Sequence, residues 1–148
     1  MMHTRRGVLG LGVTAAIVAM APPAAAQQAT SVLRNALLQF EDGVSWDAVS
    51  PAWGTLRPAW RAGVQSAGTV AAIGVGLLRL EASMGWPAVN DRWHQRRPGW
   101  VAEVTAATTA NVMAQRMLEL EAVTRWSAMR AEWRGRRQAW VDALRGVQ

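Results

Sequence analysis

Apolar residues recur along this chain with the spacing of an amphipathic helix, and the same spacing occurs three times. Apolar positions at i, i+4, i+7 and i+11 lie on one face of an α-helix and do not match the alternation of a strand. The first two copies of the pattern are Leu33, Leu37, Phe40, Val44 and Ile73, Leu77, Leu80, Met84, and the third is Met113, Met117, Leu120 and Thr124. The pattern therefore predicts one amphipathic helix in each of three successive segments.

The tryptophans repeat with the same period. All nine lie in three triplets with an internal step of seven, and each triplet is offset by forty positions from the one before: Trp46, Trp53, Trp60; Trp86, Trp93, Trp100; and Trp126, Trp133, Trp140. Four more columns keep one residue type at this offset, namely Leu38, Leu78, Leu118; Glu41, Glu81, Glu121; Ala48, Ala88, Ala128; and Arg57, Arg97, Arg137. Such a period is typical of a repeat architecture and predicts repeats at about 32–71, 72–111 and 112–148.

The tryptophans are predicted to lie on the second helix of each repeat. Seven residues make nearly two helical turns, so Trp46, Val49 and Trp53 would share one face of a continuous helix. Pro58 and Pro98 would each remove a helical hydrogen bond, so we expect a kink or break there, with Trp60 and Trp100 opening a further short helical piece. Gln138 replaces proline in the third copy, where the helix is expected to run straight.

These patterns predict an all-α fold. It would consist of three tandem 40-residue helical hairpins, stacked as a short α-solenoid or closed into a small helical bundle.

The N-terminal segment 1–26 has the order of a secretory signal peptide. Arg5 and Arg6 precede the apolar stretch Gly7 to Met20, and small residues end at Ala26 before Gln27. Residues 4–9 also resemble a twin-arginine export signal, with general secretion as the alternative. The predicted division is a signal peptide at 1–26 and a helical repeat domain at 27–148. The protein would be periplasmic or secreted, or membrane-anchored if the signal is retained.

Composition narrows the chemistry of the part after the signal. Residues 27–148 contain 14 Arg and 10 acidic residues and have no Lys, Cys or Tyr, so disulfides and thiolate metal sites are excluded. His94 is the only histidine there, and the three recurring glutamates occupy equivalent positions, which does not suit distinct acid and base roles. We therefore expect no catalytic residues, no metal, no cofactor and no nucleic-acid partner.

The repeated columns predict which residues form the core and which are free to bind. The predicted core is Trp46, Trp53, Trp86, Trp93, Trp126 and Trp133, with Leu38, Leu78 and Leu118. The candidate binding tryptophans are Trp60, Trp100 and Trp140, expected to be partly exposed beside the proline sites. Arg57, Arg97 and Arg137 either stack on a tryptophan or pair with a recurring glutamate, or they contact a carboxylate or phosphate of a ligand. The cluster of Arg130, Arg134, Arg136 and Arg137 is a candidate docking patch for an acidic partner or an anionic membrane surface.

Together these features favour an exported, non-catalytic helical-repeat protein of the bacterial cell envelope that binds or scaffolds. A protein partner is the first expectation, and an acidic glycan or anionic lipid surface is the second. The alternatives are an accessory subunit of an exported enzyme complex and a peripheral membrane or glycan-binding protein.

Overall fold

A computed structural model describes residues 24–148, and it confirms the all-α class. The predicted signal peptide lies outside the described residues, except for its last three, which begin the first helix. The long helices are α2 (Ala24–Gly43), α4 (Trp53–Gln65), α5 (Val70–Met84), α6 (Trp93–Ala106), α7 (Ala110–Val123) and α8 (Trp133–Arg145). Three short helical segments connect them in pairs: α3 (Trp46–Val49), η1 (Trp86–Ala88) and η2 (Trp126–Ala128).

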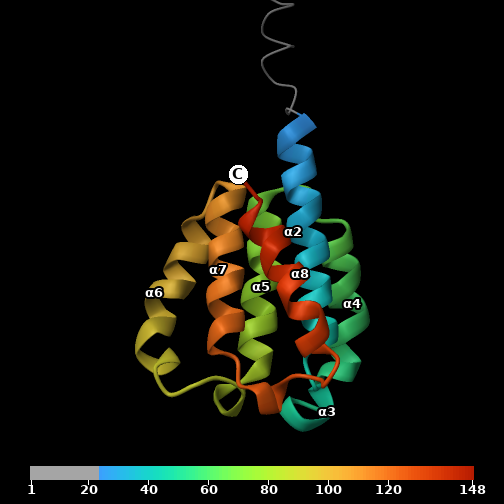
Figure 1. Ribbon diagram of the computed structural model, residues 1–148, viewed down its shortest axis with the longest axis vertical. Coiled ribbons are helices and arrows are strands. Elements are labelled where there is room, and N and C mark those ends of the chain that lie inside the picture. The colour runs from blue at the N-terminus through green and yellow to red at the C-terminus, as the bar shows by residue number, and fades with distance from the viewer. Residues whose placement is uncertain (1–23) are drawn as a thin grey trace, which may run out of the picture.

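The six long helices form a closed bundle of three helix pairs, α2/α4, α5/α6 and α7/α8. Helices α2, α5 and α7 contact one another at the centre. Helix α4 lies against α2 and α5, α6 lies against α5 and α7, and α8 lies against α7 and α2. The last helix thus packs on the first, so the arrangement is a bundle and not an open solenoid. The short segments lie at the end of the bundle opposite the C-terminus (Figure 1).

The apolar face predicted from the periodicity is the core of this bundle. Leu33, Ile73 and Met113 occupy the same column, one on each central helix, and none of them has exposed surface. Burial of such a side chain stabilises the fold by roughly 1.5–3 kcal/mol. The polar member of the face, Thr124, donates its hydroxyl to the Leu120 carbonyl at 2.7 Å, so its hydrogen-bonding need is met locally. Leu38, Leu78 and Leu118 are partly buried against this core.

The break in the tryptophan-bearing segment lies earlier than predicted. The short segment ends at Val49, and α4 begins at Trp53, so Trp46 and Trp53 do not share one continuous helix. The same interruption separates η1 from α6 and η2 from α8. Ser50-Pro51 and Asn90-Asp91 are turn-forming pairs at this interruption. The seven-residue spacing of the tryptophans favoured a continuous helix, so the prediction missed this turn signal.

The predicted break at the prolines was wrong. Pro58 and Pro98 lie inside α4 and α6, each at the sixth residue of its helix. Each proline lacks one N–H that would donate to a carbonyl one turn earlier, and the helix continues past it despite that loss. Beyond it, the buried side chains of Trp60 and Trp100 hold the helix on its neighbours.

Backbone hydrogen bonds join the linkers of neighbouring pairs. Between the first and third pairs, Ser45 N–H donates to the Ala128 carbonyl at 2.8 Å, and Arg130 N–H donates to the Gly43 carbonyl at 2.7 Å. The second and third pairs are joined in the same way, by Asn90 N–H to Val123 O and Arg125 N–H to Ala88 O, at 2.9 and 2.8 Å. These bonds fix the backbone of the linkers, including the position from which Arg130 extends.

Candidate functional site

Each helix pair contains one buried carboxylate, at the end of the bundle where the short helical segments lie. Glu41, Glu81 and Glu121 lie near the C-termini of the central helices and are 0%, 5% and 6% exposed. An unpaired carboxylate in such a place would be strongly destabilising. Each glutamate is instead held by an indole N–H and a guanidinium from the outer helix of its own pair.

The second pair shows the arrangement in its simplest form. Trp93 Nε1 donates to Glu81 Oε2 at 2.9 Å, and Arg97 Nε donates to both carboxylate oxygens at 3.0 and 2.9 Å. The hydrogen bond to Glu81 raises the pKa of the Arg97 guanidinium. The third pair repeats the arrangement with the equivalent residues Trp133, Arg137 and Glu121.

The recurring arginines thus pair with glutamate in all three helix pairs, which is one of the two structural roles predicted for them. Each ion pair stays within one helix pair. The other role, stacking on a tryptophan, is found in the second copy alone among the described residues. There the Arg97 Cζ also lies 5.9 Å from the centroid of the Trp86 ring.

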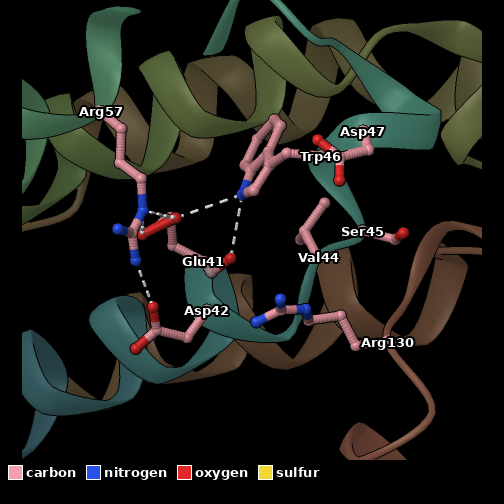
Figure 2. A pocket seen from close by; sticks show the side chains of 8 residues that line it. All are labelled: Glu41, Asp42, Val44, Ser45, Trp46, Asp47, Arg57 and Arg130. Carbon is pink, nitrogen blue, oxygen red and sulfur yellow. Dashed lines mark hydrogen bonds and ion pairs between the residues drawn. The ribbon is translucent and has the colours of Figure 1, made fainter. Parts of the chain in front are cut away.

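The first pair carries a larger version of the cluster (Figure 2). Arg57 Nε donates to both Glu41 oxygens at 2.9 Å, and a second arginine, Arg61, donates Nη1 to Glu41 Oε1 at 2.9 Å. Trp46 Nε1 donates to the Glu41 carbonyl at 3.0 Å and to its Oε2 at 3.1 Å. Asp42 accepts hydrogen bonds from both arginines. Valine stands at the Arg61 position in the other two pairs, as Val101 and Val141.

The third tryptophan of each triplet is buried, so the predicted exposure of Trp60, Trp100 and Trp140 was wrong. They are 7%, 0% and 3% exposed. Each indole Nε1 donates to a carbonyl of the next central helix: Trp60 to Gly76 at 2.9 Å, Trp100 to Arg116 at 3.0 Å and Trp140 to Ala36 at 2.8 Å. With their rings filling the seams between pairs and their N–H groups satisfied, these tryptophans are core residues.

The first tryptophan of each triplet was predicted to be core, which was wrong for two of the three. Trp86 and Trp126 are 46% and 50% exposed, because η1 and η2 lie outside the bundle and the chain turns before α6 and α8 begin. Trp46 is partly buried, stacked on Trp53 with ring centroids 4.5 Å apart. The second tryptophans, Trp53, Trp93 and Trp133, are buried as expected.

The three helix pairs differ in the residue that lies eight positions after the first tryptophan of each triplet. It is His94 in the second pair, whose ring stacks on Trp86 at 3.8 Å, and Arg134 in the third, whose Cζ lies 5.0 Å from the Trp126 ring centroid. In the first pair it is Gly54, which has no side chain to offer. An i, i+8 relation across a turn has no helical periodicity, so the sequence alone gives no reason to connect these residues.

An exposed aromatic and basic surface results at this end of the bundle. Arg134 and Arg136 are exposed, and neither forms an ion pair with another residue of the described chain. We call the surface made by Trp86, Trp126 and Arg134 the tryptophan rim. Arg130 and Arg136, also members of the predicted docking patch, are exposed but line a small pocket beside Asp42. Arg57, Arg97 and Arg137 are partly exposed, each facing a small pocket next to its glutamate.

Two kinds of feature are absent from the described part of the chain. Among residues 24–148, no three His, Asp or Glu side chains are grouped so that they could hold a metal ion. No helix in that range has the length and apolar character needed to cross a bilayer.

Comparison with known protein families gives a match over part of the chain. A domain of unknown function, DUF8799, matches residues 75–125, which run from within α5 to the residue before η2. No curated protein and no solved structure matches the chain.

Proposed function

We propose that this chain is an exported, non-catalytic helical-repeat protein of the bacterial cell envelope that binds a protein partner through the tryptophan rim. The observation that carries the proposal is the exposure of Trp86 and Trp126, two large apolar side chains on the same end of the bundle with guanidinium groups beside them. Tryptophan and arginine are among the residue types most enriched at the energetic centres of protein interfaces. Neither ring is among the side chains that pack against the core of the bundle.

We also infer that the three helix pairs are tandem copies of one 40-residue unit. Support comes from the bonds of the third tryptophans, because their acceptors Ala36, Gly76 and Arg116 follow one another at the same offset as the tryptophans themselves. The same holds for the three Glu–Trp–Arg clusters. Hairpins of this size cannot bury their apolar faces alone, so each copy needs the other two.

Export remains part of this proposal, on the basis of the N-terminal sequence. Cleavage before Gln27 would leave α2 nearly whole, because the first buried side chain of that helix is Thr30. Mass spectrometry of the protein recovered from the envelope should give an N-terminus at or near Gln27. An intact N-terminus on a membrane-bound form would favour a retained anchor.

The rim is tested by partner capture followed by direct titration. The protein, expressed in its native host with its own leader, should retain a specific envelope protein that can be identified, purified and titrated against it. Trp86→Ala combined with Trp126→Ala should weaken that binding at least about tenfold, since truncating interface anchors typically costs about 2 kcal/mol or more. Arg134→Gln should weaken it more at low than at high salt, because salt screens exposed charge.

The matched control removes exposed apolar side chains elsewhere. Leu56 and Val75 are 56% and 50% exposed on α4 and α5, and Leu56→Ala with Val75→Ala should leave binding unchanged. Equal loss in the control and rim variants would contradict the rim as the docking surface. Binding of the rim to anionic vesicles or to an acidic glycan, with no protein retained, would replace the protein partner by those alternatives.

A further inference from the structure

A small polar pocket lies beside the first glutamate cluster, at the seam where the first and third helix pairs meet. It has a volume of about 200 Å³, and its lining includes Glu41, Asp42, Ser45, Trp46, Asp47 and Arg130. Arg130 reaches it from the linker after η2, because the backbone bond from Arg130 N–H to the Gly43 carbonyl fixes that linker against the end of α2.

The inner wall of this pocket is electrically balanced. Glu41 and Asp42 carry two negative charges, and Arg57 and Arg61 carry two positive charges and donate hydrogen bonds to both carboxylates. These four residues satisfy one another and need no ligand.

The outer wall carries two further charges of opposite sign. Within residues 24–148, the carboxylate of Asp47 and the guanidinium of Arg130 take part in no ion pair or side-chain hydrogen bond, and neither does the Ser45 hydroxyl. Figure 2 shows Asp47 and Arg130 on opposite sides of Val44 and Ser45. Both exposed side chains nevertheless line this one pocket, so it offers one free acceptor and one free donor of opposite charge.

The fold does not require these charges. In the other two pairs, Pro87 and Ser127 stand in the column of Asp47, and the column of Arg130 holds Ser50 and Asn90. Both pairs nevertheless build the same buried Glu–Trp–Arg cluster. The Asp47–Arg130 couple is thus an addition to the first pair's pocket and not part of the shared framework.

We propose that this pocket binds a small zwitterion of the α-amino-acid class. The ligand carboxylate is held by Arg130, whose planar guanidinium can donate two parallel hydrogen bonds. Its ammonium group is held by Asp47, and its side chain lies toward Trp46. A ligand with a single charge would form one of these two contacts and not the other, so it should bind more weakly than a zwitterion. This site is separate from the tryptophan rim.

The direct test is to titrate the full-length protein separately with alanine, acetate and methylamine. Binding in each titration is measured by calorimetry and by the change in tryptophan emission. Alanine should bind saturably with one site per chain, and acetate and methylamine should bind at least about tenfold more weakly, a difference of about 1.4 kcal/mol or more. Absence of saturation with alanine, or equal binding of acetate, would overturn the proposal.

Substitutions of Asp47 and Arg130 test whether alanine binds in this pocket. Asp47→Asn and Arg130→Gln should each weaken alanine binding at least about tenfold, one by loss of the ammonium partner and the other by loss of the carboxylate partner. Asp91→Asn and Arg92→Gln, exposed residues of the second pair's linker, are the matched controls and should bind alanine normally. Unchanged binding in both pocket variants would place the amino acid elsewhere and refute the assignment. The rim variant Trp86→Ala with Trp126→Ala should keep alanine binding, so the two proposals fail independently.

Discussion

Replacing Trp100 by alanine should lower the free energy of unfolding by about 3–5 kcal/mol, the usual range for a large buried aromatic side chain. The indole has no exposed surface and packs edge-to-face on Trp93 with centroids 5.1 Å apart. The substitution would empty the seam between α6 and α7 and leave the Arg116 carbonyl without its donor. Denaturant unfolding followed by circular dichroism measures the change.

The matched control is Trp126→Ala, at the first position of its triplet. Because half of that side chain is exposed, the same substitution should cost less than about 1 kcal/mol. Equal losses at Trp100 and Trp126 would contradict the assignment of the third tryptophan column to the core and the first to the surface.

The second large effect concerns the buried carboxylates. Arg97→Met should destabilise the protein by about 3 kcal/mol, the lower end of the range for removing one partner of a buried ion pair, because the Arg97 side chain is itself one-third exposed and water can partly replace it. Trp93 Nε1 would then be the remaining donor to Glu81 among the described residues.

The first pair provides an internal comparison for this effect. Arg57→Met should cost at least about 1 kcal/mol less than Arg97→Met, because Arg61 still donates to Glu41 at 2.9 Å and Trp46 adds a further N–H. The double change Arg57→Met with Arg61→Val should lower the free energy of unfolding by about as much as Arg97→Met does. If Arg57→Met is as costly as Arg97→Met, the second arginine does not stabilise Glu41 and the interpretation of the larger cluster is wrong.

Periodicity was enough to predict the central helices. Leu33, Leu37 and Phe40 define a face by their spacing alone, and each is buried. The recurrence of glutamate and arginine at one fixed separation also included the observed ion pair among its three alternatives, without choosing between them. Both predictions depend on relations that stay within one helix or repeat identically between copies.

Exposure of the tryptophans could not be predicted in the same way. The seven-residue step fits one continuous helix, but the chain turns at residues 50–52, which separates Trp46 from Trp53. Trp60 was expected near a break because Pro58 precedes it, yet its surroundings are set by α5, a helix that its own segment's pattern does not describe. Contacts between different helix pairs decide which indole faces solvent, and one-helix periodicity carries no information about them.

Closure of the bundle also affects how the protein folds. The bond from Trp140 to the Ala36 carbonyl joins residues 104 positions apart, so forming the seam between α8 and α2 closes a loop that contains most of the described chain. An open solenoid gains stability additively from neighbouring units and can fray from its ends. Here no pair is terminal, and the high contact order of the closing seam should make folding slower than in helical bundles with only local contacts. Opening that one seam would expose Phe40 and Trp140 together, so the first and last helices are coupled in a single cooperative unit.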